Sequence, residues 1–455
     1  MSDLPEIFLK HLESVDGFDR DALRLAHESS RQVHSIRINP DKLNDQSNLI
    51  FSDLIKEDVP WCHYGKYLSE RPSFILDPVW HGGGYYVQEA SSMFLWHILN
   101  QINLTDEPSV RILDLCAAPA GKTTILATKY KEALIVSNET IKNRVPVLLE
   151  NCNRWGSENI VVTSNDASDL SRMDGYFDII LADVPCSGSG LFRKQPDAIG
   201  SWSENNVMLC CQRQERILSD VLPALKMGGI LIYSTCSYSR EENENIVDWL
   251  IKDHQLEPIR IGTENEWNIV ETKSEKEGWG YRFFPDKLKG EGFFNAVLKK
   301  KAGATFQKQK SKKQVKTIAR PEGLSPWLKD EKPLYFLQQN EKILAIPETI
   351  KNELTFLQQH LYLKKAGIEA GSSKGKEFIP EHALALSRLL KEDVPALELD
   401  LPNAINYLKK KEISFANPVK GWRLVRFNGI NIGWAKGLNT RINNYYPTSW
   451  RILKD

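Results

Sequence analysis

The feature that most constrains the fold is a regular alternation of short apolar segments with amphipathic ones between residues 110 and 300. Strands that alternate with helices in this way predict an α/β fold, a doubly wound parallel sheet covered on both faces. Each apolar segment ends in a polar cluster containing Asp, Glu or Cys, and ligands bind beyond the carboxyl ends of such strands. These clusters are therefore expected to meet in one crevice. The five segments are RILDL (111–115), ALIVSNE (133–139), IVVTSND (160–166), FDIILADV (177–184) and GGILIYSTC (228–236).

The chain of 455 residues is longer than one hydrophobic core usually organises, because domains hold about 150 residues each. We predict an N-terminal extension, an α/β domain, a lysine-rich linker and a C-terminal region, at residues 1–75, 76–300, 301–320 and 321–455. The extension is expected to be helix-rich with one strand-like stretch, HSIRINP. In the C-terminal region, Asn428-Gly429 joins two strand-like runs, which predicts a two-residue hairpin.

The formal net charge of zero is a sum over two unlike parts. Residues 299–455 contain 29 Lys and Arg against 15 Asp and Glu, whereas residues 1–298 contain 30 against 44. A basic appendage on an acidic body is typical of a protein that binds an anionic polymer, although a solvated lysine-rich tail has the same composition.

Several classes of protein are disfavoured by the sequence. No apolar run of about 18 residues is present, so we expect no membrane-spanning helix. The first residues, MSDLPEIFLKHLE, lack the basic and apolar regions of a signal peptide. Seven cysteines without a CxxC pair argue against a disulfide framework or a zinc ribbon. A cytoplasmic protein is therefore expected.

The first candidate site is DLCAAPAGKTT, Asp114 to Thr124, directly after the first predicted strand. Small residues there let the backbone approach a ligand. A P-loop is disfavoured, since its first glycine would fall at Cys116 and Pro119 removes an amide from the phosphate cradle. Two further acids, Glu139 and Asp166, close the second and third strands, where they suit a ribose and an adenine. Each alone would more often cap a helix, but together they favour an adenosine-containing cofactor.

The second candidate site consists of Asp183 and Cys186 after the fourth strand and Cys236 after the fifth. A lone buried cysteine is usually inert, and metal binding is disfavoured because no histidine accompanies these two. A thiolate that adds to C6 of cytosine makes C5 enamine-like and able to accept a methyl group. A carboxyl group at the ring nitrogen would stabilise that adduct, and a second thiol could assist its release.

At these residues the chain resembles the Sun-domain family of RNA (cytosine-5) methyltransferases, which use S-adenosylmethionine. The similar motifs are DLCAAPAGKTT, ADVPCSGSGLFRKQPDAI and YSTCSYSREENENIV, with YYVQEASSM and GEGFFNAVLKK on either side. The resemblance implies that Cys236 is the nucleophile, that Cys186 aids product release and that Asp183 serves both cofactor and cytosine. Two small departures are Ala120, where many members have glycine, and Val184 in place of alanine. The implied cofactor contacts are Cys116, Ala117, Ala118, Pro119, Ala120, Gly121, Lys122, Glu139, Asp166 and Asp183.

The outer segments resemble bacterial ribosomal-RNA methyltransferases of the RsmF type, with an RNA-binding N-terminal extension and a PUA-like C-terminal module at about 385–455. This resemblance implies small-subunit ribosomal RNA as the substrate and partner, with tRNA as the alternative. A non-catalytic RNA-binding assembly factor is the competing class, which the two thiols and Asp183 disfavour. No membrane or metal partner is expected, and we expect a monomer.

The C-terminal hairpin is expected to hold RNA, since arginine and tyrosine contact phosphates and unpaired bases. Residues 413–455 contain seven Lys and Arg and one acid. Trp422 and Trp434 are instead expected to fill a small β core. The residues expected to face RNA are Arg423, Arg426, Lys436, Arg441, Tyr445 and Tyr446.

Overall fold

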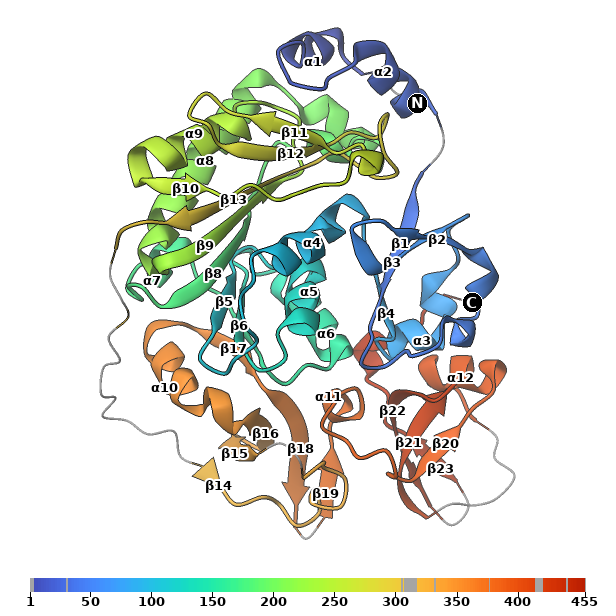
Figure 1. Ribbon diagram of the computed structural model, residues 1–455. Coiled ribbons are helices and arrows are strands. Elements are labelled where there is room, and N and C mark those ends of the chain that lie inside the picture. The colour runs from blue at the N-terminus through green and yellow to red at the C-terminus, as the bar shows by residue number, and fades with distance from the viewer. Residues whose placement is uncertain are drawn as a thin grey trace.

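The protein is described here as a computed structural model (Figure 1). The structure describes residues 4–29, 32–303, 306, 317–330, 333–375, 377–413, 420–438 and 441–454. Most of the predicted lysine-rich linker, 301–320, lies outside these residues. Among the described residues, no helix is long and apolar enough to cross a membrane.

The N-terminal part contains more strand than its sequence suggests. Two helices, α1 (Glu6–His11) and α2 (Arg20–Glu28), precede a four-stranded antiparallel sheet in the order β2-β3-β1-β4. The prediction of a single strand-like stretch is therefore wrong, although that stretch does form β1. The fourth strand lies beyond residue 75, so this sheet continues to residue 87. The strands are β1 (His34–Ile38), β2 (Ile55–Val59), β3 (Cys62–Leu68) and β4 (Tyr85–Val87).

The α/β domain contains the predicted parallel sheet. All five predicted segments form strands, and these lie parallel in the order β9-β8-β5-β6-β7. The sheet continues beyond β9 through β13, β12 and β11, each antiparallel to its neighbour, and β10 pairs with β13. The strands are β5 (Arg111–Asp114), β6 (Leu134–Asn138), β7 (Ile160–Thr163), β8 (Phe177–Asp183), β9 (Leu225–Thr235), β10 (Leu256–Pro258), β11 (Val270–Lys273), β12 (Trp279–Phe283) and β13 (Phe293–Lys300).

Helices cover both faces of this sheet because side chains at successive strand positions point to opposite faces. Ile112 packs in a core with the helices α4, α5 and α6, whereas the next residue, Leu113, packs in a second core with α1, α8 and α9. The two faces are thus buried separately, which explains why the strands read as continuous apolar runs. The helices are α3 (Pro78–His81), α4 (Phe94–Gln101), α5 (Gly121–Lys129), α6 (Val145–Trp155), α7 (Ala167–Leu170), α8 (Glu204–Val221) and α9 (Glu244–His254).

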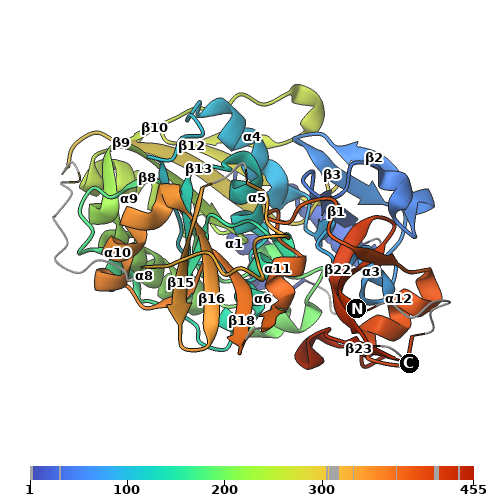
Figure 2. The ribbon, with the colours of Figure 1, turned by 90° about the horizontal axis from the view of Figure 1, so that it is seen from below.

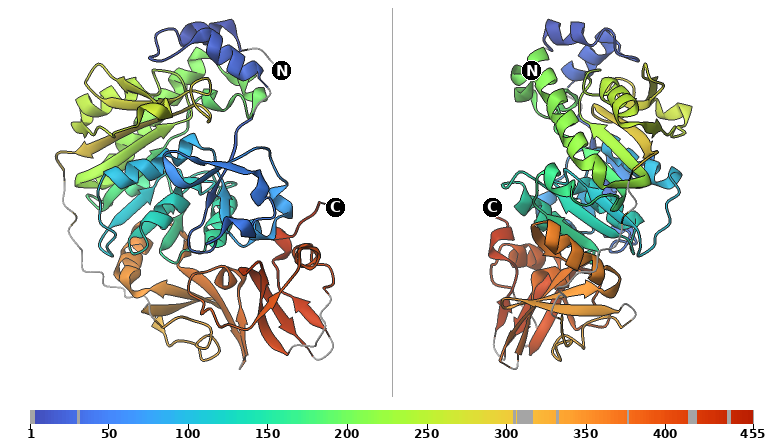
Figure 3. Two further views of the ribbon diagram at one scale, coloured as in Figure 1. Left: turned by 45° about the vertical axis from the view of Figure 1, so that its right-hand side comes forward. Right: turned by 90° about the vertical axis from the view of Figure 1, so that its left-hand side faces the viewer.

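The C-terminal region contributes two further sheets, which lie side by side at the opposite end of the molecule from α1 and α2 (Figures 1, 2 and 3). One has the order β14-β15-β16-β18-β19 and the other β20-β21-β22-β23. The elements are β14 (Thr317–Ile318), β15 (Leu334–Gln339), β16 (Lys342–Pro347), α10 (Lys351–His360), β17 (Leu363–Ala366), β18 (Ile368–Lys374), β19 (Glu377–Pro380), α11 (His382–Ala385), β20 (Ala396–Glu398), α12 (Leu401–Leu408), β21 (Gly421–Phe427), β22 (Ile430–Gly437) and β23 (Ile442–Asn444).

One C-terminal strand, β17, leaves its own region and pairs antiparallel with β7 at the edge of the central sheet. The predicted hairpin is confirmed: β21 and β22 pair antiparallel, and Asn428 and Gly429 both have positive φ, at 49° and 75°. Positive φ at both central residues is what a type I′ turn requires.

Candidate functional site

The central sheet has a switch point between β5 and β8. The chain proceeds from β5 through β6 to β7 on one side, whereas β8 and β9 lie on the other. Loops at such a point diverge and leave a crevice beyond the carboxyl ends of the strands. Asp183 is the last residue of β8, and the other predicted catalytic and cofactor residues come after the end of one of these five strands.

A cavity of about 180 Å³ lies at the switch point. Asp183 lines it from the end of β8, and Tyr86 to Glu89 line it from the end of β4 and the residues after it. The predicted loop contributes Cys116, Ala117, Ala118, Pro119, Gly121 and Lys122, whereas Ala120 is buried and serves as the N-cap of α5 with φ of 92°. Six of the seven residues from 116 to 122 thus surround one small cavity.

Two buried acids beside this loop have unused acceptor atoms. Asp114 accepts a 2.6 Å hydrogen bond from Thr123 Oγ1 through one oxygen, and the other oxygen has no partner among the described residues. Burial raises the pKa of Asp114 to about 7. Glu139 accepts from the Ile141 amide at 2.8 Å, and its second oxygen lies 3.4 Å from Arg144 without a hydrogen bond. Such acceptors suit a ligand that carries hydroxyl or ammonium donors.

Asp183 connects the loop to the two strands beside the switch point. Its Oδ2 accepts a 2.7 Å hydrogen bond from Lys122 Nζ, and its Oδ1 accepts one of 2.8 Å from Ser234 Oγ on β9. The carboxylate is therefore fixed in orientation while about a third of its side-chain surface remains exposed.

Asp166 has a different environment from the other predicted acids. It caps α7 through the Ser168 amide and hydroxyl and accepts from Arg216 Nη1 at 3.2 Å. Burial acts to raise its pKa, but these partners hold the pKa below its ordinary value. It does not line the cavity. Asp166 thus caps the N-terminus of α7, which is the usual role of an isolated acid at such a position.

The two predicted thiols lie next to each other. Cys186 Sγ and Cys236 Sγ are 3.0 Å apart, both cysteines are free, and the Cys236 amide donates to Cys186 Sγ at 3.3 Å. The hydrogen bond with Cys236, and then burial, raise the pKa of Cys186 well above its ordinary value. Cys186 therefore stays a protonated thiol at neutral pH and can donate its S–H to the Cys236 sulfur.

Glu242 holds the two thiol loops together. This carboxylate is fully buried and accepts from the Ser187 amide at 2.7 Å, from Ser187 Oγ at 2.5 Å and from Ser237 Oγ at 2.5 Å. Each serine directly follows one of the cysteines in the sequence. Sequence reasoning missed Glu242, because in REENENIV it is one of several acids at the start of a helix.

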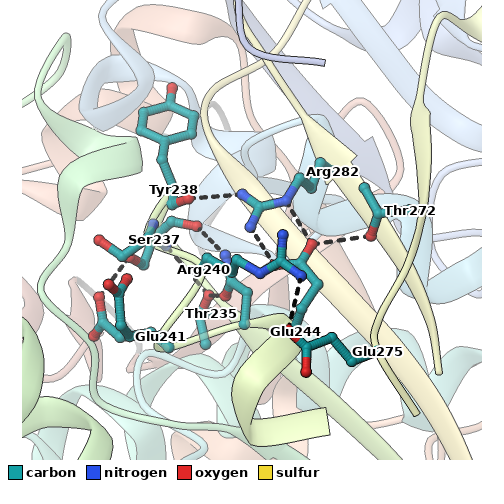
Figure 4. A network of polar contacts seen from close by, with 12 residues as sticks. Thr235, Ser237, Tyr238, Arg240, Glu241, Glu244, Thr272, Glu275 and Arg282 are labelled. Carbon is teal, nitrogen blue, oxygen red and sulfur yellow. Dashed lines mark hydrogen bonds and ion pairs between the residues drawn. The ribbon is translucent and has the colours of Figure 1, made fainter. Parts of the chain in front are cut away.

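A second network fixes the segment after Cys236 (Figure 4). Arg282 on β12 forms a buried ion pair with Glu244 and donates to the Tyr238 carbonyl at 2.7 Å. Thr272 on β11 also donates to Glu244, at 2.9 Å. Burial acts to raise the pKa of Glu244, but Arg282 holds it below its ordinary value. The loop that carries Cys236 is thus held by Arg282, on the antiparallel strand β12, as well as by Glu242.

The C-terminal hairpin differs from the expected RNA surface at one tyrosine. Tyr446 is buried, and its hydroxyl lies 2.8 Å from His81 Nδ1, so it joins the hairpin module to the N-terminal part. The expectation that it faces RNA is wrong. Tyr445 is 38% exposed and contacts Trp422 at a ring separation of 4.4 Å, whereas Trp434 is buried in the core as expected. The four basic residues of the expected RNA surface lie on β21 and β22 or just after them, at Arg423, Arg426, Lys436 and Arg441.

The described ranges contain no group of three or more His, Cys, Asp or Glu side chains able to hold a metal ion. The doubly wound sheet, the small-residue loop at its switch point and the acids beside it define a Rossmann-like domain with a ligand-binding crevice.

Comparison with known proteins identifies the family. A family model described as 16S rRNA methyltransferase RsmB/F matches residues 101–299, and models of the RsmF N-terminal and PUA domains match residues 4–90 and 394–452. Ribosomal RNA small subunit methyltransferase F of Psychromonas ingrahamii is 31% identical over 412 residues, which cover 86% of this chain and 84% of the relative. The protein of that name from Aliivibrio fischeri is 28% identical, over 98% of this chain and 97% of its own. The chain belongs to the RsmB/F family of 16S rRNA methyltransferases.

Solved structures show the same fold. A methyltransferase homolog from Pyrococcus horikoshii has a TM-score of 0.54 and 28% identity, covering 65% of this chain and 95% of its own. NSun6 from the same organism, solved with SFG, has a TM-score of 0.54 at 19% identity, over 65% of this chain and 98% of its own.

Proposed function

We propose that the protein transfers a methyl group from S-adenosylmethionine to C5 of a cytosine in small-subunit ribosomal RNA. The observation that carries the proposal is the pair of thiols 3.0 Å apart, beyond the strands next to the small-residue loop. The names of the full-length relatives support ribosomal RNA as the substrate.

The cavity residues fit S-adenosylmethionine. The cofactor would lie against the loop from Cys116 to Lys122, and one of its donors would meet the free oxygen of Asp114, which lines the cavity. Glu139, whose second oxygen faces Arg144, is proposed to accept a further donor beside that loop. When bound, it supplies an electrophilic methyl group. Asp166 is a weaker contact in this proposal, because its carboxylate is already used by Ser168 and Arg216.

Cys236 is the proposed nucleophile. Its thiolate forms a bond to C6 of cytosine, and the electron pair of the C5–C6 double bond moves into the ring, which makes C5 nucleophilic. Asp183, held by Lys122 and Ser234, would accept a hydrogen bond from the ring nitrogen once that nitrogen has taken up a proton in the adduct. After methylation, C5 loses its proton, the C6–sulfur bond breaks and its electron pair returns to Cys236.

Cys186 has the complementary role. Its raised pKa keeps it protonated, so it donates a hydrogen bond to the Cys236 sulfur. A donor at that distance stabilises the thiolate both before attack and when it leaves C6. The proposed roles of the two cysteines therefore differ because Cys186 is held as a thiol that can donate to the Cys236 sulfur.

The outer regions are proposed to hold the RNA. In the proposed division, residues 1–75 form an RNA-binding extension, 76–300 the catalytic domain, 301–320 a linker and 321–455 the region with the PUA-like module. We propose that the protein works in the cytoplasm as a monomer, on RNA alone or within a small-subunit particle.

The test is transfer of labelled methyl from S-adenosylmethionine to a small-subunit RNA transcript, to the particle and to tRNA in competition. We expect label at C5 of a cytosine in the ribosomal RNA and none with Cys236→Ala. Methylation that survives Cys236→Ala would exclude this nucleophile, and preference for tRNA would exclude the proposed substrate.

A further inference from the structure

A large groove lies next to the cofactor cavity, where the N-terminal sheet, α6 and the end of the chain meet. Its volume is about 620 Å³, against about 180 Å³ for the cofactor cavity. Figure 1 shows the C-terminal end of the chain beside α3 and the N-terminal sheet. The roles proposed above for the thiols and the cofactor loop do not use this groove.

The lining of the groove is cationic and aromatic. Arg71, Arg154 and Lys454 line it, together with aromatic rings that include Trp80 and Trp155. None of the described residues that line it is acidic. Arg71 and Lys454 are exposed at the surface, whereas Trp155 is only 2% exposed. The groove thus has exposed cations at its rim and buried or half-buried rings in its wall.

The wall also contains polar donors without acceptors. Arg154 lies 4.1 Å above the Trp80 ring and donates to Asn151 and Glu150, yet its Nε has no hydrogen-bond partner. Trp155 Nε1 is likewise without one. Buried donors are rarely left unpaired in a native structure. These two point to a ligand that brings acceptor atoms.

A further positive charge lies behind the wall. Arg37 is fully buried with its guanidinium 4.5 Å above the Trp155 ring, and its hydrogen bonds go to the neutral Gln88 and Thr124. The described residues contain no ion pair for it. Burial lowers its pKa to about 10, so it remains a cation at neutral pH. The charge of this region therefore favours an anionic ligand.

The groove is connected to the cofactor cavity. Tyr86 and Val87 line both. The Tyr86 hydroxyl and the Asn151 side chain, from the groove side, donate to the Pro119 carbonyl at 3.0 and 2.7 Å. A ligand in the groove would thus lie one residue away from the loop that surrounds the cofactor.

We propose that this groove is a binding site for an unpaired nucleotide of the RNA substrate, one that flanks the target cytosine. Base stacking on aromatic side chains and cations for the backbone are the features by which proteins bind single-stranded RNA. The base lies against the partly exposed rings of the wall, Trp80 and Tyr86, and Arg71 and Lys454 contact phosphates at the rim. This site deepens the proposed function, on which it rests.

The test is binding of a fluorescein-labelled single-stranded RNA, with the target sequence and without S-adenosylmethionine, to the full-length protein. The variant Arg71→Glu with Lys454→Glu changes two exposed residues. Its matched control, Lys252→Glu with Lys276→Glu, makes the same change in net charge on exposed residues of α9 and the loop before β12. We expect roughly tenfold weaker binding by the groove variant and a salt slope shallower by about 1.4, because each lost phosphate contact removes about 0.7.

Equal effects of the groove and control variants would overturn the proposal. So would unchanged RNA affinity of the groove variant. If that variant bound naked RNA normally but a small-subunit particle weakly, the groove would contact a ribosomal protein instead. The binding assay omits S-adenosylmethionine. The measured RNA affinity can therefore be interpreted even if the proposed methylation is not observed.

A second measurement locates the nucleotide. RNA with 4-thiouridine next to the target cytosine is irradiated on the protein, and the linked peptides are identified by mass spectrometry. Links to the peptide that holds Trp80 or Tyr86 are expected. Links confined to the C-terminal hairpin would place the flanking nucleotide elsewhere and would refute the groove.

Discussion

Replacing Glu242 by glutamine tests whether one buried carboxylate positions both thiols. One carboxylate oxygen of Glu242 accepts from the Ser187 amide and from Gln214, and the other accepts from both serine hydroxyls. Glutamine is neutral and offers one acceptor oxygen in place of two, so either the Ser187 amide or the two serine hydroxyls lose a charged acceptor. A hydrogen bond to a charged group is worth about 1.5–3 kcal/mol. If about 2 kcal/mol of this appears in the barrier, attack by Cys236 slows roughly 30-fold.

The assay follows formation of the covalent adduct between the protein and RNA that contains 5-fluorocytosine. Fluorine at C5 cannot leave as a proton, so the adduct accumulates after methyl transfer, and its rate of formation reports on attack and methyl transfer without the release step. RNA affinity is measured separately and should change little, because Glu242 is fully buried. A fall in the rate at saturating RNA is therefore expected, rather than a rise in KM.

The pH profile gives a readout that general loosening of the fold would not produce. The pKa of Cys186 is raised chiefly by its hydrogen bond with Cys236, then by burial, and also by the charge of Glu242. Removing that charge lowers the pKa of Cys186, so the alkaline limb of the profile should move to lower pH. The control is Glu241→Gln, whose carboxylate lies 3.2 Å from His11 and is not bonded to either serine. An unchanged rate and profile for Glu242→Gln, or an equal loss for Glu241→Gln, would refute the reasoning.

Three further predictions concern the neighbouring residues. Cys186→Ala should bind RNA and accumulate a covalent adduct through Cys236 under turnover conditions; gels that show no adduct would remove its role in release. Glu244→Leu leaves Arg282 buried without its partner and should lower the free energy of unfolding by about 3–5 kcal/mol, measured by urea denaturation; a loss below about 1 kcal/mol would contradict this. Asp114 has a pKa of about 7 in the fold and about 3.9 when unfolded, so its proton is bound more strongly in the fold and stability falls as pH rises between these values. Asp114→Asn should remove that fall, so that without cofactor its melting temperature relative to the parent rises from pH 4 to 7; a constant difference would be evidence against the raised pKa.

The parallel sheet could be predicted because each of its strands is buried on both faces and so leaves an apolar run of four to eight letters. The thiols could be predicted to lie together because both follow such strands in short polar turns. By contrast, β2 has exposed charged residues at three successive positions, Lys56, Glu57 and Asp58, and in β3 the polar or small residues His63, Gly65 and Lys66 interrupt the apolar run. The sequence therefore does not predict these two strands in the N-terminal part.

Contacts between distant segments could not be predicted. Tyr445 and Tyr446 are adjacent in sequence, but only the fold shows that the second is bonded to His81. Glu242 is chemically indistinguishable from the acids beside it until Ser187 is brought 2.5 Å from its carboxylate. Asp166 follows a strand at the same edge of the sheet as the other site acids, but its carboxylate already accepts hydrogen bonds from Ser168 and Arg216.

The pairing of β17 with β7 has a consequence for synthesis of the chain. The ribosome releases the strand Ile160–Thr163 about 200 residues before its partner Leu363–Ala366. During that interval the edge of the catalytic sheet is an open apolar strand, a template for pairing with other chains. A nascent chain cannot complete its catalytic sheet until β17, which ends at Ala366 in the first half of the C-terminal region, has been translated. Products shortened before residue 363 would retain every catalytic residue and still expose that edge, which makes them prone to aggregate.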